Sequence, residues 1–191
     1  PEIWINFAQK SCIDELLATT RDIPDYDELM SQRLRILDEN GLKIHQIQEV
    51  IDTLGPLEGA ADFLDWLRGE MQVIILSDTF YEFAAPFMRQ LGYPTIFCHN
   101  LTIGDDGSVQ SYNLRMPDQK REAVLRFREI NFNTIAAGDS YNDTTMLSEA
   151  DRGILFCPPD NVIEEFPQFP VTRNYDELKA EFIKAREIIR S

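Results

Sequence analysis

The segment that most constrains the fold of this chain lies at residues 135–147, where a short apolar run gives way to a polar cluster. Residues 135–138 are too few for a helix of their own and end in glycine, which predicts a buried strand. Helical spacing begins again at Met146 and Leu147. The sequence therefore places Asp139 and Asp143 at the carboxyl end of a strand, one helical turn apart.

Acidic side chains in that position suit a metal ion. In an open α/β sheet, ligands bind beyond the carboxyl ends of the strands. Two carboxylates on one helical face offer the oxygen ligands of a hard cation, and Mg²⁺ in addition keeps waters for a phosphate group. The same residues also fit a structural role, in which Asp139 or Ser140 caps the helix and Asp143 interacts with the helix dipole. The motif alone leaves both interpretations open.

The net charge limits the partners of such a site. The 191 residues include 33 acidic and 18 basic side chains, a formal charge of −15, without a run of lysine or arginine. Nucleic acid and anionic membranes are therefore not expected as partners. The chain also has no apolar run of about 18 residues and nothing like a signal peptide. The scattered Cys12, Cys98 and Cys157 fit reduced thiols, so we expect a cytoplasmic protein.

The first 55 residues have only helical patterns. The longest helix is expected at about residues 26–39, where apolar side chains share one face. Arg33 lies on that same face. Because an unpaired buried charge costs free energy, its guanidinium either reaches solvent, pairs with an internal acid or binds an anionic ligand.

From residue 57 onward, strand and helix patterns alternate, which predicts a doubly wound parallel sheet. A β-branched run at residues 73–76 predicts a buried strand, and Ser77, Asp78 and Thr79 follow it directly. Their hydroxyl and backbone N–H groups either cradle a phosphate at the start of the next helix or simply cap that helix.

Three later segments complete the pattern. A strand at residues 94–98 is followed by a hairpin at 101–114 that turns at 105–107. Lys120 lies in the first turn of a helix capped by Asp118, where a basic side chain is unfavourable unless an anion shares the site. A proline-containing loop then precedes the terminal helix.

Together these motifs resemble those of the haloacid dehalogenase-like phosphatases. A strand that ends in Ser77 and a helix that opens with Lys120 match two of that family's four motifs. The strand that ends in Asp139, with Asp143 beyond it, matches a third, in the usual order. The resemblance implies a Rossmann-like parallel α/β core at residues 57–191 and a small all-helical cap at residues 1–56.

Residues 20–26, 76–83 and 165–170 carry a closer resemblance to one branch of the family, the bifunctional phosphoserine phosphatases and phosphoserine:homoserine phosphotransferases. Ordinary phosphoserine phosphatases have two glycines where this chain has Asp78 and Thr79. The resemblance implies a Mg²⁺-dependent reaction through an aspartyl-phosphate intermediate, with water or homoserine as acceptor. A non-catalytic phosphometabolite-binding relative, or a phosphatase for another small phosphorylated metabolite, is the alternative.

Residue roles follow from the same resemblance. Ser77 would hydrogen-bond the phosphoryl oxygens, and Lys120 would offset their negative charge. Asp139 would ligate Mg²⁺, and Asp143 would orient or assist. The residues implied to contact the substrate are Arg33, through the substrate carboxylate, and Ser77, Asp78, Thr79, Asn142 and Glu2.

The family's first motif, which holds the nucleophilic aspartate, belongs before the cap, and this chain starts at Pro1 within the cap. We expect a segment of roughly a dozen residues upstream, about one strand and its motif loop. The 191 residues alone are expected to be inactive and poorly folded, because two apolar strand edges would be exposed. The sequence leaves a monomer and a homodimer open, the latter with Trp4 and other cap apolar residues in the interface.

Overall fold

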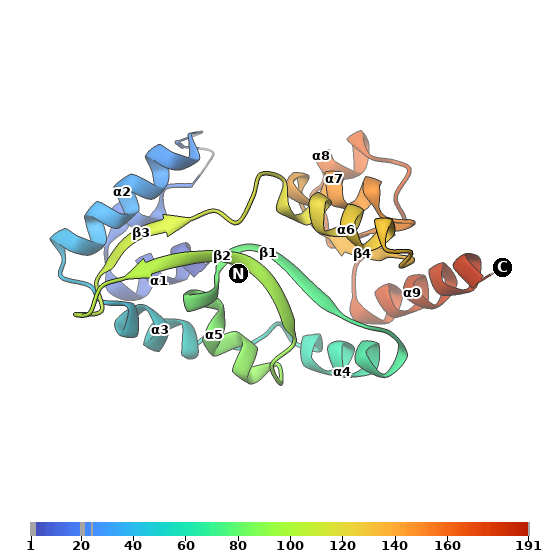
Figure 1. Cartoon of the computed structure of the whole chain (residues 1–191), viewed down its shortest axis with the longest axis horizontal. Coiled ribbons are helices and arrows are strands. Elements are labelled where there is room, and N and C mark those ends of the chain that lie inside the picture. The colour runs from blue at the N-terminus through green and yellow to red at the C-terminus, as the bar shows by residue number, and fades with distance from the viewer. Residues whose placement is uncertain (1–2, 20–21, 24, 191) are drawn as a thin grey trace. The chain divides into compact units, whose positions relative to one another are not determined.

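A computed structural model describes the chain except for residues 1–2, 20–21, 24 and 191 (Figure 1). The chain packs as two compact units. Unit 1 comprises the residues up to Leu57 together with Val73–Arg115, and unit 2 comprises Glu58–Gln72 together with the residues from Met116 onward. The division into a cap at 1–56 and a core at 57–191 follows from the family resemblance rather than from this packing, and it stays a prediction.

Unit 1 contains most of the helices expected near the N-terminus. Helix α2 spans Tyr26–Glu39, as the apolar spacing predicted. It begins there because the Asp25 carboxylate accepts a hydrogen bond from the Glu28 N–H at 2.9 Å. Figure 1 shows α2 beside β3, and α3 beside α5. The other helices of the unit are α1 (Ile3–Ser11), the 3₁₀ helix η1 (Asp14–Leu17), α3 (Ile44–Asp52) and α5 (Tyr81–Gln90).

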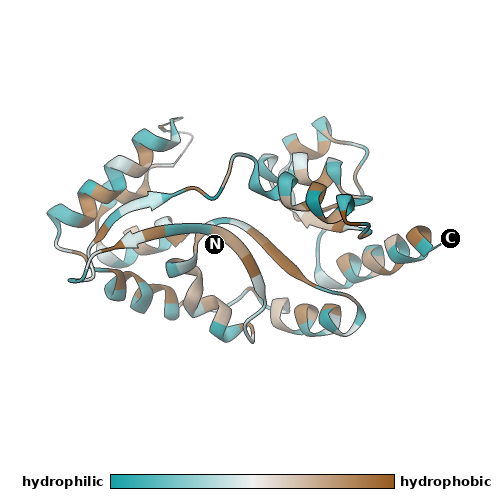
Figure 2. Cartoon of the chain, viewed as in Figure 1, coloured by the Kyte–Doolittle hydropathy of each residue, from teal (hydrophilic) through white to brown (hydrophobic). Residues whose placement is uncertain are grey.

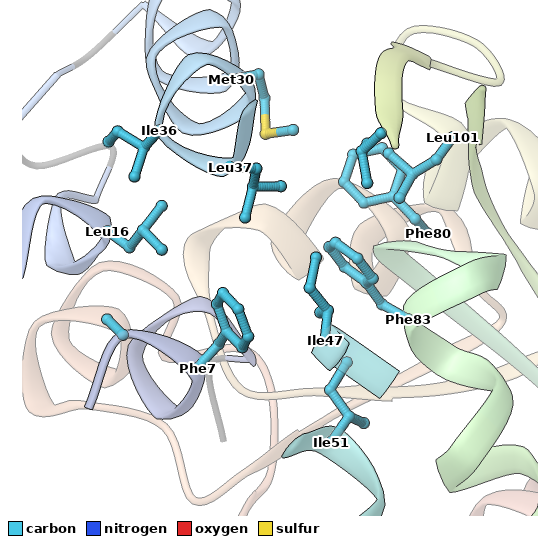
Figure 3. Close-up of a cluster of buried hydrophobic side chains, with 12 residues drawn as sticks. Phe7, Leu16, Met30, Ile36, Leu37, Ile47, Ile51, Phe80, Phe83 and Leu101 are labelled. Carbon is cyan, nitrogen blue, oxygen red and sulfur yellow. The ribbon is translucent and has the colours of Figure 1, made fainter. Parts of the chain in front are cut away.

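A single apolar cluster holds unit 1 together (Figure 3). Its members come from α1, η1, α2, α3, α5 and all three strands of the unit's sheet, so burial of these side chains stabilises their packing. Trp4, a candidate for a dimer contact, packs edge-on against Phe83 of the same chain at 5.3 Å between ring centroids. The homodimer stays a prediction. The buried cluster consists of Phe7, Ala8, Leu16, Met30, Ile36, Leu37, Ile47, Ile51, Phe80, Phe83, Leu101 and Val109.

The sheet of unit 1 has the order β1-β2-β3, with β1 (Ile74–Phe80) parallel to β2 (Thr95–Ile103) and β2 antiparallel to β3 (Val109–Asn113). The predicted hairpin is confirmed, and Gly107 adopts a φ of 82° in its turn. The break predicted between residues 98 and 101 is wrong. One strand runs through both segments, because its first part pairs with β1 and residues 100–103 pair with β3 on the other side.

Unit 2 contains the second sheet, of order β4-β5-β6, in which all strands are parallel. The strands are β4 (Ile135–Gly138), β5 (Arg152–Phe156) and β6 (Val171–Thr172). Polar and apolar residues alternate along α9 (Figure 2), as expected for a helix with one buried face. The helices are α4 (Ala60–Glu70), α6 (Gln119–Glu129), α7 (Tyr141–Glu149), α8 (Asp160–Glu165) and α9 (Tyr175–Arg190).

Parallel strands connected through helices confirm the predicted α/β class. Helix α8 was not predicted, because the surrounding prolines favoured a loop at residues 157–170. In the part of the chain that the structure describes, no helix is both long enough and apolar enough to cross a membrane.

Candidate active site

The carboxyl end of β4 carries a buried ion pair. Lys120 Nζ lies 2.9 Å from Asp143 Oδ1, and the two side chains are only 11% and 9% exposed. The other carboxylate oxygen of Asp143 accepts hydrogen bonds from the N–H groups of Asp139 and Ser140, at 3.0 and 3.1 Å, and from the Ser140 hydroxyl at 3.1 Å. Asp143 thus organises the turn that connects β4 to α7.

Gly138 makes this arrangement possible. A Cβ atom added at Gly138 would lie 2.4 Å from Asp143 Cβ and 2.6 Å from its Cγ. Contacts that short do not occur between non-bonded carbon atoms, so any residue larger than glycine would displace the aspartate or the strand end. The glycine that marked the end of the strand in the sequence therefore has a second role, which the sequence did not reveal.

The structure bears out the helix-capping interpretation of the acidic motif, whereas the metal-ligand interpretation stays a prediction. Asp143 is the third residue of α7, and its acceptance of the Ser140 N–H is one half of a capping box. Ser140 is the N-cap of α7, as one of the alternatives predicted, and Asp143 completes the capping box in addition to its ion pair with Lys120. Asp139 is exposed at the end of β4 and is available to an incoming ligand.

The two carboxyl groups differ in their electrostatic surroundings. Partial desolvation and the negative charge of Asp143 raise the pKa of Asp139. Burial pushes the pKa of Asp143 upward too, but the Lys120 ammonium and the N–H donors outweigh it and lower the pKa. Asp143 is therefore the stably ionised member of the pair, whereas the charge on Asp139 would be favoured by a nearby cation.

The arrangement fits a cation with few protein ligands. Among the described residues, no group of three or more His, Cys, Asp or Glu side chains could enclose a metal ion. Mg²⁺ does not need such a cage, since it is held by one or two carboxylates and retains several waters. Asp139 has the chemistry of a direct metal ligand. The carboxylate of Asp143, already occupied by hydrogen bonds, is suited to hold Asp139 in place.

The start of α6, the helix that carries Lys120, is attached to α7. Asp118 precedes α6 in the left-handed conformation, with a φ of 45°. The sequence predicts that its carboxylate caps α6, but the carboxylate instead accepts a hydrogen bond from the Thr145 hydroxyl of α7 at 2.8 Å. The expected cap interaction is wrong, because the left-handed backbone directs the side chain away from the first turn. As a result, the start of α6 is attached to α7.

Ser77, Asp78 and Thr79 lie within strand β1 in unit 1. Leu76 pairs with Phe97 and Phe80 pairs with His99, so the three residues between them bulge opposite a single residue of β2. The Thr79 N–H donates to Ser77 Oγ at 3.3 Å.

The alternative in which residues 77–79 cap the next helix is wrong, because the N-cap of α5 is Phe80. The strand continues to Phe80, and α5 begins at Tyr81. The bulge interrupts the ladder but not the extended backbone, so these residues are neither a helix cap nor a helix N-terminus. Their contact with a phosphoryl group stays a prediction.

Arg33 is buried on α2, with 7% of its surface exposed. Its guanidinium donates to the Ala18 carbonyl at 2.9 Å and stacks on the Trp4 ring, with Cζ 4.6 Å from the ring centroid. The solvent-reaching alternative is therefore wrong. Burial is the main reason that the pKa of Tyr26 is raised. The positive charge of Arg33 lowers this pKa and the negative charge of Asp78 raises it, so both side chains act on the Tyr26 phenol within unit 1.

The remaining candidates are positioned less closely. Asn142 is exposed, one residue before Asp143 in α7. Glu2 lies outside the described residues. No sequence signal indicates the Ala18 carbonyl or Thr145, because each acts through a contact distant along the chain.

The parallel α/β fold and the buried lysine–aspartate pair at a strand end agree with the family that the motifs resemble. The chain belongs to the haloacid dehalogenase-like hydrolases, whose family model matches residues 6–151. It is 65% identical over 185 residues to phosphoserine phosphatase ThrH of Pseudomonas aeruginosa, which covers 97% of this chain and 90% of that protein.

Other comparisons agree with this family. The chain is 65% identical over 191 residues to a phosphoserine phosphatase of Pseudomonas syringae pv. tomato, covering 99% of this chain and 81% of that protein. Among solved structures, a phospho-aspartyl intermediate analogue of phosphoserine phosphatase matches with a TM-score of 0.73 at 20% identity, covering 94% of this chain and 91% of that one. At that identity, the match shows the fold alone.

Proposed function

We propose that this protein is a cytoplasmic, Mg²⁺-dependent phosphoserine phosphatase. The observation that carries the proposal is the 65% identity, over nearly the whole chain, to two proteins with that name. The buried Lys120–Asp143 pair beside Asp139 supports it, since fixed positive charge is what phosphoryl transfer requires. The reaction would convert phosphoserine and water into serine and phosphate.

Each candidate residue has a separate task in the proposed reaction. The Lys120 ammonium would stabilise negative charge on the transferring group, and Asp143 would hold that ammonium and the Asp139 backbone in place. Asp139 would hold Mg²⁺, which supplies charge neutralisation of the phosphate oxygens. Ser77 would donate a hydrogen bond to those oxygens. The phosphoryl group would pass first to an aspartate carboxylate, with release of serine, and then to water, which restores the aspartate.

Phosphate release tests this function directly. The enzyme is incubated with phosphoserine, phosphoethanolamine and phosphoglycolate, each with Mg²⁺ and with a chelator. We expect turnover that needs Mg²⁺ and prefers phosphoserine. Tight phosphoserine binding without turnover would instead identify a phosphometabolite-binding protein, and preference for another ester would identify a different phosphatase.

A second acceptor is favoured by one observation. Asp78 and Thr79 replace the two glycines of ordinary phosphoserine phosphatases, and they lie in the β1 bulge. We propose that this enzyme also transfers the phosphoryl group from phosphoserine to homoserine. Adding homoserine should reduce phosphate release while phosphohomoserine accumulates, as followed by ³¹P NMR. Unchanged phosphate release with no new phosphoester would leave hydrolysis as the sole reaction.

Asp139→Asn should abolish Mg²⁺-dependent turnover, with kcat reduced by about a thousandfold, a scale typical of lost electrostatic stabilisation. The amide keeps the shape of the side chain but removes the charge that a hard cation prefers. Calorimetric titration with Mg²⁺ should show weaker binding by the variant. Asp151→Asn is a suitable control, because Asp151 lies in the same unit and binds Thr134 instead. Full Mg²⁺ affinity in Asp139→Asn would rule out the ligand assignment.

Arg33→Lys should raise KM for phosphoserine by about tenfold while KM for phosphoethanolamine, which has no carboxylate, changes little. Arginine can bind a carboxylate through two parallel hydrogen bonds, and lysine cannot. The matched control is Arg35→Lys on the same helix, because Arg35 is exposed and pairs with Glu39. Equal increases for both substrates would show that Arg33 supports the fold rather than reading the carboxylate.

A further inference from the structure

Tyr141 connects the acidic turn to a segment far along the chain. It is the first residue of α7 and lies between Asp139 and Asp143 in the sequence. Its hydroxyl donates a hydrogen bond to the carboxylate of Glu165, the last residue of α8. Its ring packs edge-on against Phe166, with 5.8 Å between centroids. The hydrogen bond to Glu165 raises the pKa of Tyr141, so the phenol remains protonated as the donor.

The segment that holds Glu165 is itself fixed. Phe166 stacks on Phe169 at 6.3 Å between centroids, and Phe169 lies against β5, where a Cβ atom at Gly153 would be 2.9 Å from its ring. At the start of the segment, the Arg173 guanidinium donates to the Pro158 carbonyl at 3.0 Å. Glu165 is thus a stationary acceptor rather than part of a free loop.

Because Tyr141 lies within the turn between β4 and α7, its contact with Glu165 can affect the geometry of that turn. Its backbone follows Ser140, whose N–H and hydroxyl both donate to Asp143. A small rotation of residue 141 would therefore change the direction of Asp139 on one side and of Asn142 on the other.

We propose that Tyr141 is a positioning residue that fixes the geometry of Asp139 through its contact with Glu165. The inference rests on the proposed Mg²⁺-dependent function and adds a residue pair that acts on the metal site without touching the metal. Groups that orient a metal ligand influence affinity through the ligand's direction. The residues 165–170, which the sequence resemblance singled out, thereby gain a role in the site.

Calorimetric Mg²⁺ titration of single variants tests this role without depending on turnover. Tyr141→Phe removes the hydroxyl and keeps the ring on Phe166, and Glu165→Ala removes the acceptor. Both should weaken Mg²⁺ binding by roughly tenfold, the lower limit for lost support of a metal ligand. Glu165→Gln keeps an acceptor oxygen and should stay within about twofold of the unaltered protein.

Three controls separate positioning from other effects. Glu164→Ala removes an exposed acid from the same helix, so it measures the effect of charge alone. Tyr81→Phe removes a comparable phenol hydrogen bond, to the Ile96 carbonyl at 3.0 Å, from the first residue of α5. Neither should change Mg²⁺ affinity. The double variant Tyr141→Phe/Glu165→Ala should bind Mg²⁺ no more weakly than either single variant, because the two substitutions remove the same hydrogen bond.

The outcomes distinguish this inference from the proposed function. Unchanged Mg²⁺ affinity in Tyr141→Phe, or equal losses in Glu164→Ala and Glu165→Ala, would overturn the positioning role and leave the phosphatase proposal intact. No Mg²⁺ binding by the unaltered protein would overturn both.

Discussion

Replacing Gly138 by alanine should inactivate the enzyme and lower its free energy of unfolding by about 3 kcal/mol, the upper range for overpacking a rigid site. The added methyl group would lie 2.4 Å from Asp143 Cβ. Neither neighbour can yield easily, because Gly138 is paired with Leu155 of β5 and Asp143 is held by Lys120 and the turn. The methyl group would therefore push Asp143 out of the ion pair.

Urea denaturation and phosphate release measure the two effects of Gly138→Ala separately. The matched control is Gly69→Ala in α4 of the same unit, where no atom lies within 4 Å of the added Cβ. Because alanine is favoured over glycine within a helix, this control should gain about 0.5–1 kcal/mol and keep full activity. If Gly138→Ala melted and turned over like the unaltered enzyme, the close packing described at this glycine would be wrong.

Lys120→Ala should also have a large effect, with loss of turnover and about 3 kcal/mol of unfolding free energy. Removing one member of a buried pair leaves the other charge without compensation. Asp143 would remain in a site where only 9% of its side chain is exposed. The backbone N–H donors would still contact it, which keeps the expected loss at the lower end of the range for such pairs.

Two companion variants identify the cause of that loss. Lys184→Ala breaks an exposed pair with Glu181 in α9 and should cost less than about 1 kcal/mol. Adding Asp143→Asn to Lys120→Ala removes the uncompensated charge, so part of the lost stability should return while activity remains absent. A Lys120→Ala protein no less stable than Lys184→Ala would contradict the buried character of the pair.

The fold could be predicted where local pattern and packing agree. The bounds of α2 follow from its apolar face and from Asp25 as cap, and β4 follows from four residues ended by a glycine. The strand β1 extends beyond its apolar run because residues 77–79 bulge without leaving the extended conformation. Periodicity cannot detect such a bulge, since the inserted residues break the alternation on which it depends.

For the candidate site, the sequence identified residues but not their contacts. It selected Lys120, Asp139 and Asp143 from their residue types and their places after strands and within first turns. It could not pair Lys120 with Asp143, because 23 residues separate them and only the packing of α6 on α7 brings them together. The contact between Tyr141 and Glu165 could not be predicted for the same reason.

The attachment of α6 to α7 determines at which step the Lys120 side chain loses its rotamer entropy. A free lysine side chain carries about 2 kcal/mol of rotamer entropy. Here the ammonium is fixed by Asp143, and the start of its helix is fixed by the hydrogen bond from Thr145 to Asp118. This entropy is therefore lost once, during folding. In the proposed reaction, a phosphate ester that reached Lys120 would meet a charge already in place, and its binding energy would not be reduced by ordering that side chain.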